Sequence, residues 1–153
     1  MIEAQRDPAF WRRIATHPEV APHALMGAGP EIIAPLLAED TTIALASENG
    51  GFFFLKLDGL GFVRELHTLY TPEGWGREVA QALKEATEAV FATAQVIVTQ
   101  EQEGWWRSAP PKSHGWKPAG PYREVGLAAP LRTWILTREA WEQSPARRRL
   151  PCP

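Results

Sequence analysis

The sequence predicts an α/β (α+β) fold with a mixed, mostly antiparallel central sheet and helices on both of its faces. Three apolar segments, residues 42–46, 51–57 and 62–70, are joined by short glycine-bearing turns, so the strands they predict must be antiparallel. Residues 76–94 then change to helical spacing, and the β-branched segment 95–99 follows. Strand, helix and strand in this order predict a right-handed βαβ crossover.

The remaining elements follow from local signals along the chain. Asp7 and Pro8 form a helix start, because an N-cap residue is followed by proline at the first helical position. A loop over 18–30 leads to a short helix over 31–38. The last third is predicted to hold a loop, two strands and a short final helix after the cap residue Thr137: residues 100–115, 117–124, 131–136 and 138–141.

Length and composition fit one globular domain. The chain has 153 residues, of which 44% are apolar and 22% charged, and these values rule out a disordered chain. We expect a single domain over 1–146 and a basic, mobile tail over 147–153. The longest apolar run, 52–55, is far too short for a membrane helix, and the N-terminus lacks a signal-peptide pattern. With one cysteine, Cys152, a cytoplasmic location is expected.

Charge and tryptophan are distributed unevenly along the chain. Residues 1–103 hold 7 Lys and Arg against 15 Asp and Glu, whereas residues 104–153 hold 9 against 3. Five of the seven tryptophans lie in the second segment. Because Trp105 and Trp106 are adjacent in a predicted loop beside Arg107, we expect a partner or homodimer surface there. The overall net charge of −2 argues against nucleic acid as a partner.

The segment from Leu66 to Leu83 carries the strongest chemical signal. A strand ends at Pro72, a glycine-bearing turn follows, and the long helix begins. Backbone N–H groups at a helix start form an anion site suited to phosphate. Gly74 and Gly76 would let a ligand approach the backbone closely. Glycines can equally serve the turn alone, so the pattern by itself leaves both interpretations open.

The order of the elements and this turn resemble the GNAT N-acetyltransferase superfamily. In that family a hydrophobic-x-Pro-Glu turn leads into an Arg/Gln-x-x-Gly-x-Gly/Ala motif, whose amides hold the pyrophosphate of CoA. Here residues 70–74 take the place of the lead-in, and the motif falls on 75–80. The resemblance implies transfer of an acyl group from acetyl-CoA, or another acyl-CoA, to an amine of a small molecule or protein. It implies cofactor contacts from these residues, the first two pairing with the pantetheine arm through their backbone: Leu69, Tyr70, Gly74, Trp75, Gly76, Arg77, Glu78, Val79 and Ala80.

Two runs, Glu65–Thr68 and Pro110–Trp116, look closest to GNAT-like proteins from phage and prophage genes. Two motif positions depart from the family: Trp75 stands in place of Arg or Gln, and Glu78 in place of the central Gly. Glu78 would place negative charge where a pyrophosphate sits, and like charges repel. The alternative hypothesis is therefore a GNAT-fold protein without catalysis that serves as a binding or assembly module, for example in a phage-like particle.

Acyl transfer to an amine needs a general base and often an acid for the leaving thiolate. Glu65 and His67 lie on one face of the predicted strand, so His67 could act directly and Glu65 through a water. The family's acid is a Tyr before a Gly-Phe pair; it has no counterpart here, and His114, Ser113 or Tyr122 are the substitutes. Each of these side chains could instead be a hydrogen-bonded structural residue. The four histidines show no metal-ligand spacing, so we expect no metal.

Overall fold

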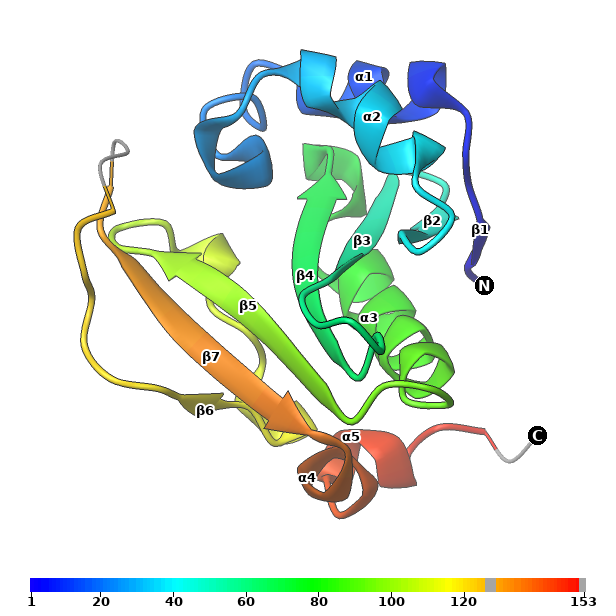
Figure 1. The fold of residues 1–153 in the computed structure, drawn as a ribbon, viewed down its shortest axis with the longest axis vertical. Coiled ribbons are helices and arrows are strands. Elements are labelled where there is room, and N and C mark those ends of the chain that lie inside the picture. The colour runs from blue at the N-terminus through cyan, green and yellow to red at the C-terminus, as the bar shows by residue number, and fades with distance from the viewer. Residues whose placement is uncertain (126–128, 152–153) are drawn as a thin grey trace. The chain divides into compact units, whose positions relative to one another are not determined.

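The computed structural model describes residues 1–125 and 129–151, and its seven strands form one sheet (Figure 1). The strands are β1 Glu3–Ala4, β2 Ile43–Ser47, β3 Gly50–Lys56, β4 Val63–Tyr70, β5 Val96–Gln102, β6 Lys117–Pro118 and β7 Leu131–Thr137. Their order in the sheet is β1-β2-β3-β4-β5-β7-β6. The β4–β5 pair is parallel, whereas the β1–β2, β2–β3, β5–β7 and β6–β7 pairs are antiparallel, which confirms the predicted mixed sheet.

Within the described residues, five α-helices and several 3-10 turns accompany these strands. The helices are α1 Pro8–Ala15, α2 Ile33–Ala38, α3 Arg77–Val90, α4 Arg138–Glu142 and α5 Pro145–Arg148. The 3-10 turns are η1 Ala24–Gly27, η2 Pro30–Ile32, η3 Pro72–Gly74, η4 Trp106–Ser108 and η5 Lys112–His114. Helix α3 lies between the parallel strands β4 and β5 in the chain, which is the predicted βαβ order.

The chain divides into two compact units. Unit 1 comprises Met1–Leu55 and His67–Ala86, and unit 2 comprises Lys56–Leu66 and Thr87–Pro153. Strand β4 and helix α3 therefore each contribute residues to both units. The two units interleave along the chain, and the single domain expected over 1–146 remains a prediction.

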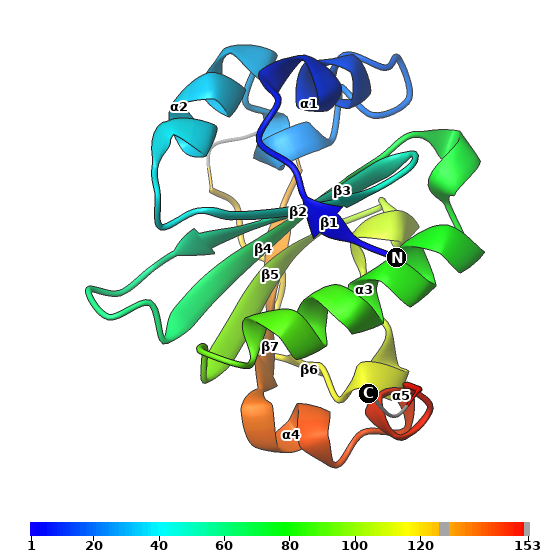
Figure 2. The same cartoon turned by 90° about the vertical axis from the view of Figure 1, so that its right-hand side faces the viewer.

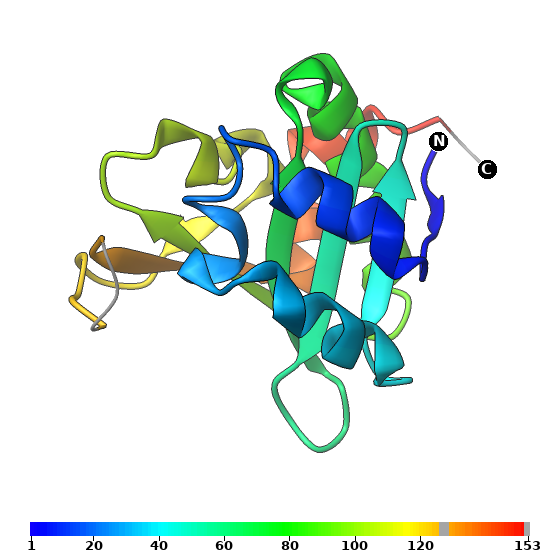
Figure 3. The same ribbon diagram turned by 90° about the horizontal axis from the view of Figure 1, so that it is seen from above.

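In unit 1, helices α1 and α2 lie over strands β2 and β3, as Figure 3 shows from above. The first part of α3 lies on the opposite face of these strands (Figure 2), so helices cover both faces as predicted. Helix α1 begins where expected, because the Asp7 side chain accepts a hydrogen bond of 2.9 Å from the Ala9 N–H. Trp11 is fully buried with its ring centroid 4.2 Å from that of Phe53, at the centre of an apolar core.

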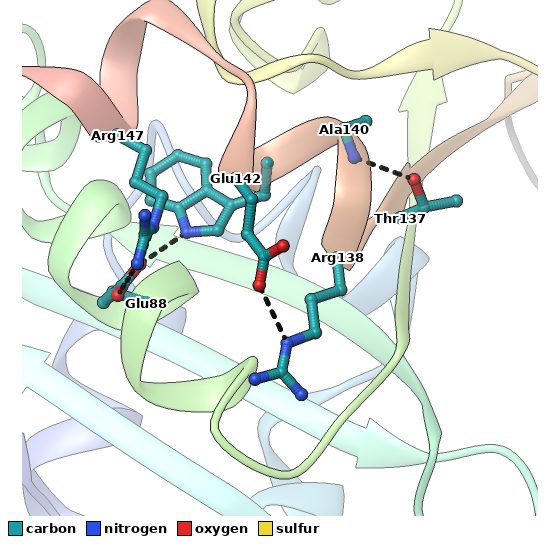
Figure 4. A network of polar contacts seen from close by, with 7 residues as sticks. Glu88, Thr137, Arg138, Ala140, Glu142 and Arg147 are labelled. Atoms are coloured by element: carbon teal, nitrogen blue, oxygen red, sulfur yellow. Dashed lines mark hydrogen bonds and ion pairs between the residues drawn. The ribbon is translucent and has the colours of Figure 1, made fainter.

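In unit 2, β5 pairs along its whole length with β7, from Val96 opposite Thr137 to Gln102 opposite Leu131. The side chains of Ile97 and Leu136 are fully buried on this ribbon. Thr137 caps α4 as predicted, because its hydroxyl accepts from the Ala140 N–H at 3.1 Å (Figure 4). The short helices α4 and α5 then end the chain of this unit.

The last third departs from two of the expected element bounds. A strand was expected over 117–124, but β6 comprises only Lys117–Pro118. Further along the segment, one isolated bridge pairs Arg123 with Leu131. Prolines within the segment lack the N–H that a ladder needs, and Gly120 has a φ of +96°, which turns the backbone out of the strand. The strand expected over 95–99 instead runs on to Gln102, because β7 supplies pairing partners that far.

The boundary expected between domain and tail, at 146/147, falls inside α5. Arg147 there donates to Glu88, so this residue belongs to the described structure of unit 2. Cys152, in the last part of the expected tail, lies outside the described residues. Across residues 1–125 and 129–151, every helix is too short or too polar to span a bilayer. In the same ranges no three His, Cys, Asp or Glu side chains gather as metal ligands would.

Candidate functional site

The connection between β4 and α3 is built from one 3-10 turn and one left-handed glycine. The Trp75 N–H donates to the Pro72 carbonyl at 3.2 Å, which closes η3. Gly76 has a φ of +95°, a conformation that side chains rarely adopt, and this turn needs a glycine there. The Ala80 N–H then donates to the Gly76 carbonyl at 3.0 Å. The N–H groups of residues 77–79 therefore have no carbonyl acceptor within the helix, and an anion site at a helix start requires such groups.

The two glycines of the turn have different surroundings. A Cβ on Gly76 would meet no atom within 4 Å, so the space over its backbone is open. A Cβ on Gly74 would lie 2.6 Å from Tyr70 Cδ1 and 2.9 Å from Asn49 Cβ, closer than real Cβ atoms come. Gly74 therefore serves the packing of the turn, whereas Gly76 leaves room where the family motif would place a ligand.

Glu78, in the first turn of α3, binds the turn between β2 and β3. Its Oε1 accepts hydrogen bonds from the Ser47 hydroxyl at 2.6 Å and from the Asn49 backbone N–H at 2.9 Å. Its Oε2 accepts from Asn49 Nδ2 at 2.8 Å. We call these three hydrogen bonds the Glu78 clasp. Both carboxylate oxygens are thus engaged by donors of the same chain, and a carboxylate in the first turn also suits the helix dipole.

The clasp continues into the end of β4. The Tyr70 hydroxyl lies 2.9 Å from Ser47 Oγ, and because Ser47 donates to Glu78, Tyr70 donates to Ser47. Burial raises the pKa of Tyr70 to about 12, so its proton stays in place at neutral pH. Burial opposes ionisation of Glu78 as well, but the hydrogen bonds from Ser47 and Asn49 outweigh it and hold its pKa below the ordinary value. The result is a chain of donors that ends on an ionised carboxylate.

Trp75 is turned toward the interior of unit 1. Its indole packs against the apolar core around Trp11, and its Nε1 donates to the Tyr70 carbonyl at 3.0 Å. The bulky side chain that replaces the family's Arg or Gln therefore makes contacts within its own chain. These contacts supply both an apolar surface and an acceptor for the indole, which is what a partly buried tryptophan requires.

The two residues predicted to pair with the pantetheine arm differ in backbone direction. A Cβ on Gly50, the first residue of β3, would collide with the Leu69 carbonyl oxygen. The Leu69 carbonyl group therefore points toward β3. Alternation along the strand turns the polar groups of Tyr70 the other way, where its carbonyl accepts the bond from Trp75. A carbonyl oxygen has two lone pairs, so Tyr70 keeps one more acceptor position. Cofactor contacts of both residues remain predictions.

A pocket of about 450 Å³ lies beside the start of α3. Trp75, Arg77, Glu78 and Gln81 contribute to its lining. Arg77 is exposed, whereas the Glu78 carboxylate is taken up by the clasp. Of the other predicted motif residues, Val79 is half-buried and Ala80 is exposed. The lining of the pocket thus combines the basic Arg77 with two acidic side chains, Glu73 and Glu78, of which Glu78 is engaged in the clasp.

Glu65 and His67 take the places on β4 that the period-two rule assigns to one face. Glu65 is half-buried and His67 is 9% exposed. The neighbour Thr68 is exposed on the other face. Glu65 and His67 both engage in interactions within the protein, so a structural role and a catalytic role are both compatible with their positions.

His114, the third candidate, lies in unit 2 at the end of η5 and is 2% exposed. Its ring centroid is 5.4 Å from that of Trp141, another buried side chain. This environment is that of a packed aromatic pair. Of the two adjacent tryptophans expected to form a partner surface, Trp105 is half-buried, and the side chain of Trp106 lies outside what the structure describes. The partner surface therefore remains a prediction.

Sequence reasoning missed two polar clusters that depend on contacts between distant residues. The clasp joins residues 29 and 31 positions apart, and no local pattern marks such a pair. In unit 2, Glu101 accepts from Arg132 Nε at 2.9 Å and from Trp134 Nε1 at 3.0 Å, and the Arg132 guanidinium lies 4.6 Å from the ring centroid of Tyr122. The signal available in the sequence was a Ser-x-Asn turn between two strands, which alone is too common to single out.

No protein-family model matches this chain, and no curated protein matches its sequence. Solved structures do match. A ribosomal-protein-alanine N-acetyltransferase from Brucella melitensis is 16% identical, with a TM-score of 0.68 over 90% of this chain and 99% of the other. A spermidine N-acetyltransferase from Vibrio cholerae, solved with CoA and spermine, is 11% identical, with a TM-score of 0.69 over 93% and 97%. An acetyltransferase of the GNAT family from Streptococcus pneumoniae is 14% identical, with a TM-score of 0.62 over 90% and 98%.

The chain has the GNAT fold. The match spans nearly the whole of each chain. At these low identities the likeness establishes the fold, and activity has to be argued from the site.

Proposed function

We propose that this protein is a GNAT-family N-acyltransferase that takes an acyl group from acetyl-CoA, or another acyl-CoA, and transfers it to an amine of a small molecule or protein. One observation carries the proposal. The two side chains that depart from the family pattern, Trp75 and Glu78, are both bonded within their own chain. The backbone at Gly76 remains open, as a pyrophosphate site needs.

The similar solved structures support the same class of activity. Two of the three described above are named as N-acetyltransferases, and one contains CoA together with spermine. A spermine is an alkylamine, so an amine acceptor is the class we propose here as well.

Each residue of the proposed site has a role that its position allows. The N–H groups of the first turn of α3 would bind the pyrophosphate, and Arg77 would offset part of its charge. Bound acyl-CoA would supply the thioester. His67 would take a proton from the ammonium group of the acceptor, so that the free amine can attack the thioester carbonyl and CoA can leave as its thiolate; Glu65, acting through a water, is the second candidate base. We assign His114 to packing, because it is buried against Trp141.

The first test is binding of acetyl-CoA by isothermal titration calorimetry. We expect a dissociation constant in the range of about 1 μM to 1 mM, where enzyme substrates commonly lie. Absence of heat at millimolar acetyl-CoA would overturn the proposal. Thiol release from acetyl-CoA is then measured with polyamines, aminoglycosides and lysine peptides as acceptors.

The second test separates chemistry from binding. Replacing a general base typically costs about 10²- to 10⁴-fold in rate, so His67→Ala should lower kcat by that order while the dissociation constant of acetyl-CoA stays unchanged. Thr68→Ala is the matched control, because Thr68 is the next residue of β4 and is exposed. Equal kcat values for His67→Ala and the wild type would assign His67 to structure alone.

The alternative, a binding or assembly module of a phage-like particle, has one observation in its favour. The Tyr70 carbonyl, predicted to pair with the pantetheine arm, already accepts from Trp75. This alternative predicts no thiol release with any acceptor, and acetyl-CoA binding that Trp75→Arg combined with Glu78→Gly improves. A wild type that binds acetyl-CoA as tightly as this double variant would exclude it.

A further inference from the structure

We infer that Glu78 is a positioning residue, which holds the first turn of α3 through the β2–β3 turn and directs its charge to Ser47 and Asn49. The inference rests on the proposed function, because the turn it holds is the proposed pyrophosphate site. On this inference, Glu78 in place of the central Gly of the motif supports the site and does not obstruct it. Glu78 is then a working part of the site, and removing it should weaken cofactor binding.

The geometry of the clasp shows where the carboxylate points. All three donors come from two residues of one turn, and each lies within 2.6–2.9 Å of a Glu78 oxygen. Charge-assisted hydrogen bonds of this length are the strong ones. Because both oxygens are held by the β2–β3 turn, they are directed toward Ser47 and Asn49, and the neutral donors screen the charge locally.

The clasp acts on the turn that carries the N–H groups. Asn49 also accepts, through its carbonyl, a bond of 3.0 Å from the Thr71 N–H, just before η3. Gly74 packs against Asn49 and Tyr70 so closely that a Cβ would not fit. The β2–β3 turn therefore touches the connection before η3, at η3 and in the first turn of α3. Glu78 supplies the last of these three attachments.

The opposite interpretation predicts an effect of opposite sign. If Glu78 faced the pyrophosphate, removing its charge would relieve repulsion, and Glu78→Ala and Glu78→Gly would both bind acetyl-CoA more tightly. If Glu78 positions the turn, both variants lose the clasp and bind more weakly, by about tenfold, which is the scale of one or two hydrogen bonds to a charged group. The direction of the change in the dissociation constant decides between the two.

Rescue variants test the clasp itself. Glu78→Gln can keep all three contacts if the Asn49 amide rotates, so its dissociation constant should stay within about threefold of the wild type. Asn49→Asp puts two carboxylates against each other and should weaken binding as Glu78→Ala does. Combining Asn49→Asp with Glu78→Gln restores the pairing with the charge moved to the β2–β3 turn, and should restore binding. The control is Glu85→Ala, which removes a carboxylate about two turns further along α3 that accepts from the Ile2 N–H instead of from the β2–β3 turn.

The kinetic readout separates positioning from a general loss of structure. We expect KM for acetyl-CoA to rise in Glu78→Ala and Asn49→Asp while kcat changes by less than about threefold, because the groups proposed for chemistry are untouched. Measurements are made below the thermal midpoint of each variant. Tighter binding by Glu78→Ala or Glu78→Gly, or no recovery in the Asn49→Asp and Glu78→Gln combination, would overturn the inference.

Hydrogen exchange keeps the inference testable if the wild type binds no acetyl-CoA. That outcome would remove the proposed function, yet the clasp would still predict faster amide exchange at residues 48–51 and 76–80 in Glu78→Ala and Asn49→Asp. The combined variant should return exchange to the wild-type level. Unchanged exchange in both single variants would overturn the positioning role.

Discussion

Two carboxylates on α3, Glu78 and Glu88, each bind a segment that is distant in sequence, but they use different partners. In unit 1, Glu78 binds neutral donors of the β2–β3 turn. In unit 2, Glu88 accepts from Trp141 Nε1 at 2.7 Å and from Arg147 at 3.0 Å (Figure 4). Hydrogen bonding to Arg147 is the main cause that lowers the pKa of Glu88.

The difference predicts how each attachment responds to salt, pH and mutation. The Glu88–Arg147 pair is a surface ion pair, since both side chains are 42% exposed. Such pairs contribute little and are screened by salt. The Glu78 contacts are hydrogen bonds to uncharged groups, which salt screens much less. The same helix thus carries one attachment that depends on a cation and one that depends on donors placed by a tight turn.

The largest effect is expected from Trp141→Ala in unit 2. Trp141 is 1% exposed and packs against His114, so its removal leaves a cavity and should cost about 3–5 kcal/mol of unfolding free energy. Urea denaturation measures the loss. Trp141→Phe keeps most of the volume but loses the N–H to Glu88, and should cost less. A loss below about 1 kcal/mol for Trp141→Ala would contradict this expectation, because it would show that neither the packing of Trp141 nor its hydrogen bond to Glu88 contributes much to stability.

The second effect is that of Glu78→Ala on stability. Loss of three hydrogen bonds to a charged group should lower the unfolding free energy by about 2 kcal/mol, and the loss should be nearly the same in low and high salt. Urea denaturation at two salt concentrations tests both statements. A loss that disappears in high salt would mean that long-range charge, not the clasp, is the source of the stabilisation.

The third effect, that of Arg147→Ala, should be smaller. We expect a loss of less than about 1 kcal/mol at low salt and almost none near 1 M salt. Arg148→Ala, which removes an exposed cation from the same helix, is the control for total charge. If both variants lose the same amount, the specific contact with Glu88 contributes nothing beyond net charge.

The smallest effect is the pH dependence of the two carboxylates. The pKa of each is lowered from 4.5 in the folded protein, so each contributes stability above that value and loses it as pH falls through the folded pKa. The stability difference between wild type and Glu78→Gln should therefore shrink on going from neutral pH to below the folded pKa. A difference that grows in acid would require a folded pKa above the ordinary value.

Local signals in the sequence predicted the elements that depend on neighbouring residues. The Asp7 cap, the Thr137 cap and the amphipathic period of α3 are all defined within a few positions, and all three are present. The strand expected over 117–124 was wrong beyond Pro118, because backbone pairing there is interrupted by residues that lack a donor or turn the chain.

The candidate site could be located from the sequence but its contacts could not. The Pro-Glu turn and the glycines marked the place where β4 gives way to α3. Whether Trp75 and Glu78 obstruct that place depends on which way their side chains turn, and this is decided by Tyr70, Ser47 and Asn49, at separations that range from 5 to 31 residues. Non-local packing of this kind leaves no periodic trace in a single sequence.

The close contact of Gly74 with Asn49 also has a consequence for recognising related chains. Gly74 and Glu78 are four residues apart in the sequence. The β2–β3 turn contacts both of them: Asn49 packs against Gly74, and Ser47 and Asn49 donate to Glu78. A chain that carries Gly-x-x-x-Glu from this 3-10 turn into the helix should therefore carry Ser-x-Asn between β2 and β3, and substitutions at the two places should occur together. This paired pattern would identify relatives that a search for the glycine motif alone passes over.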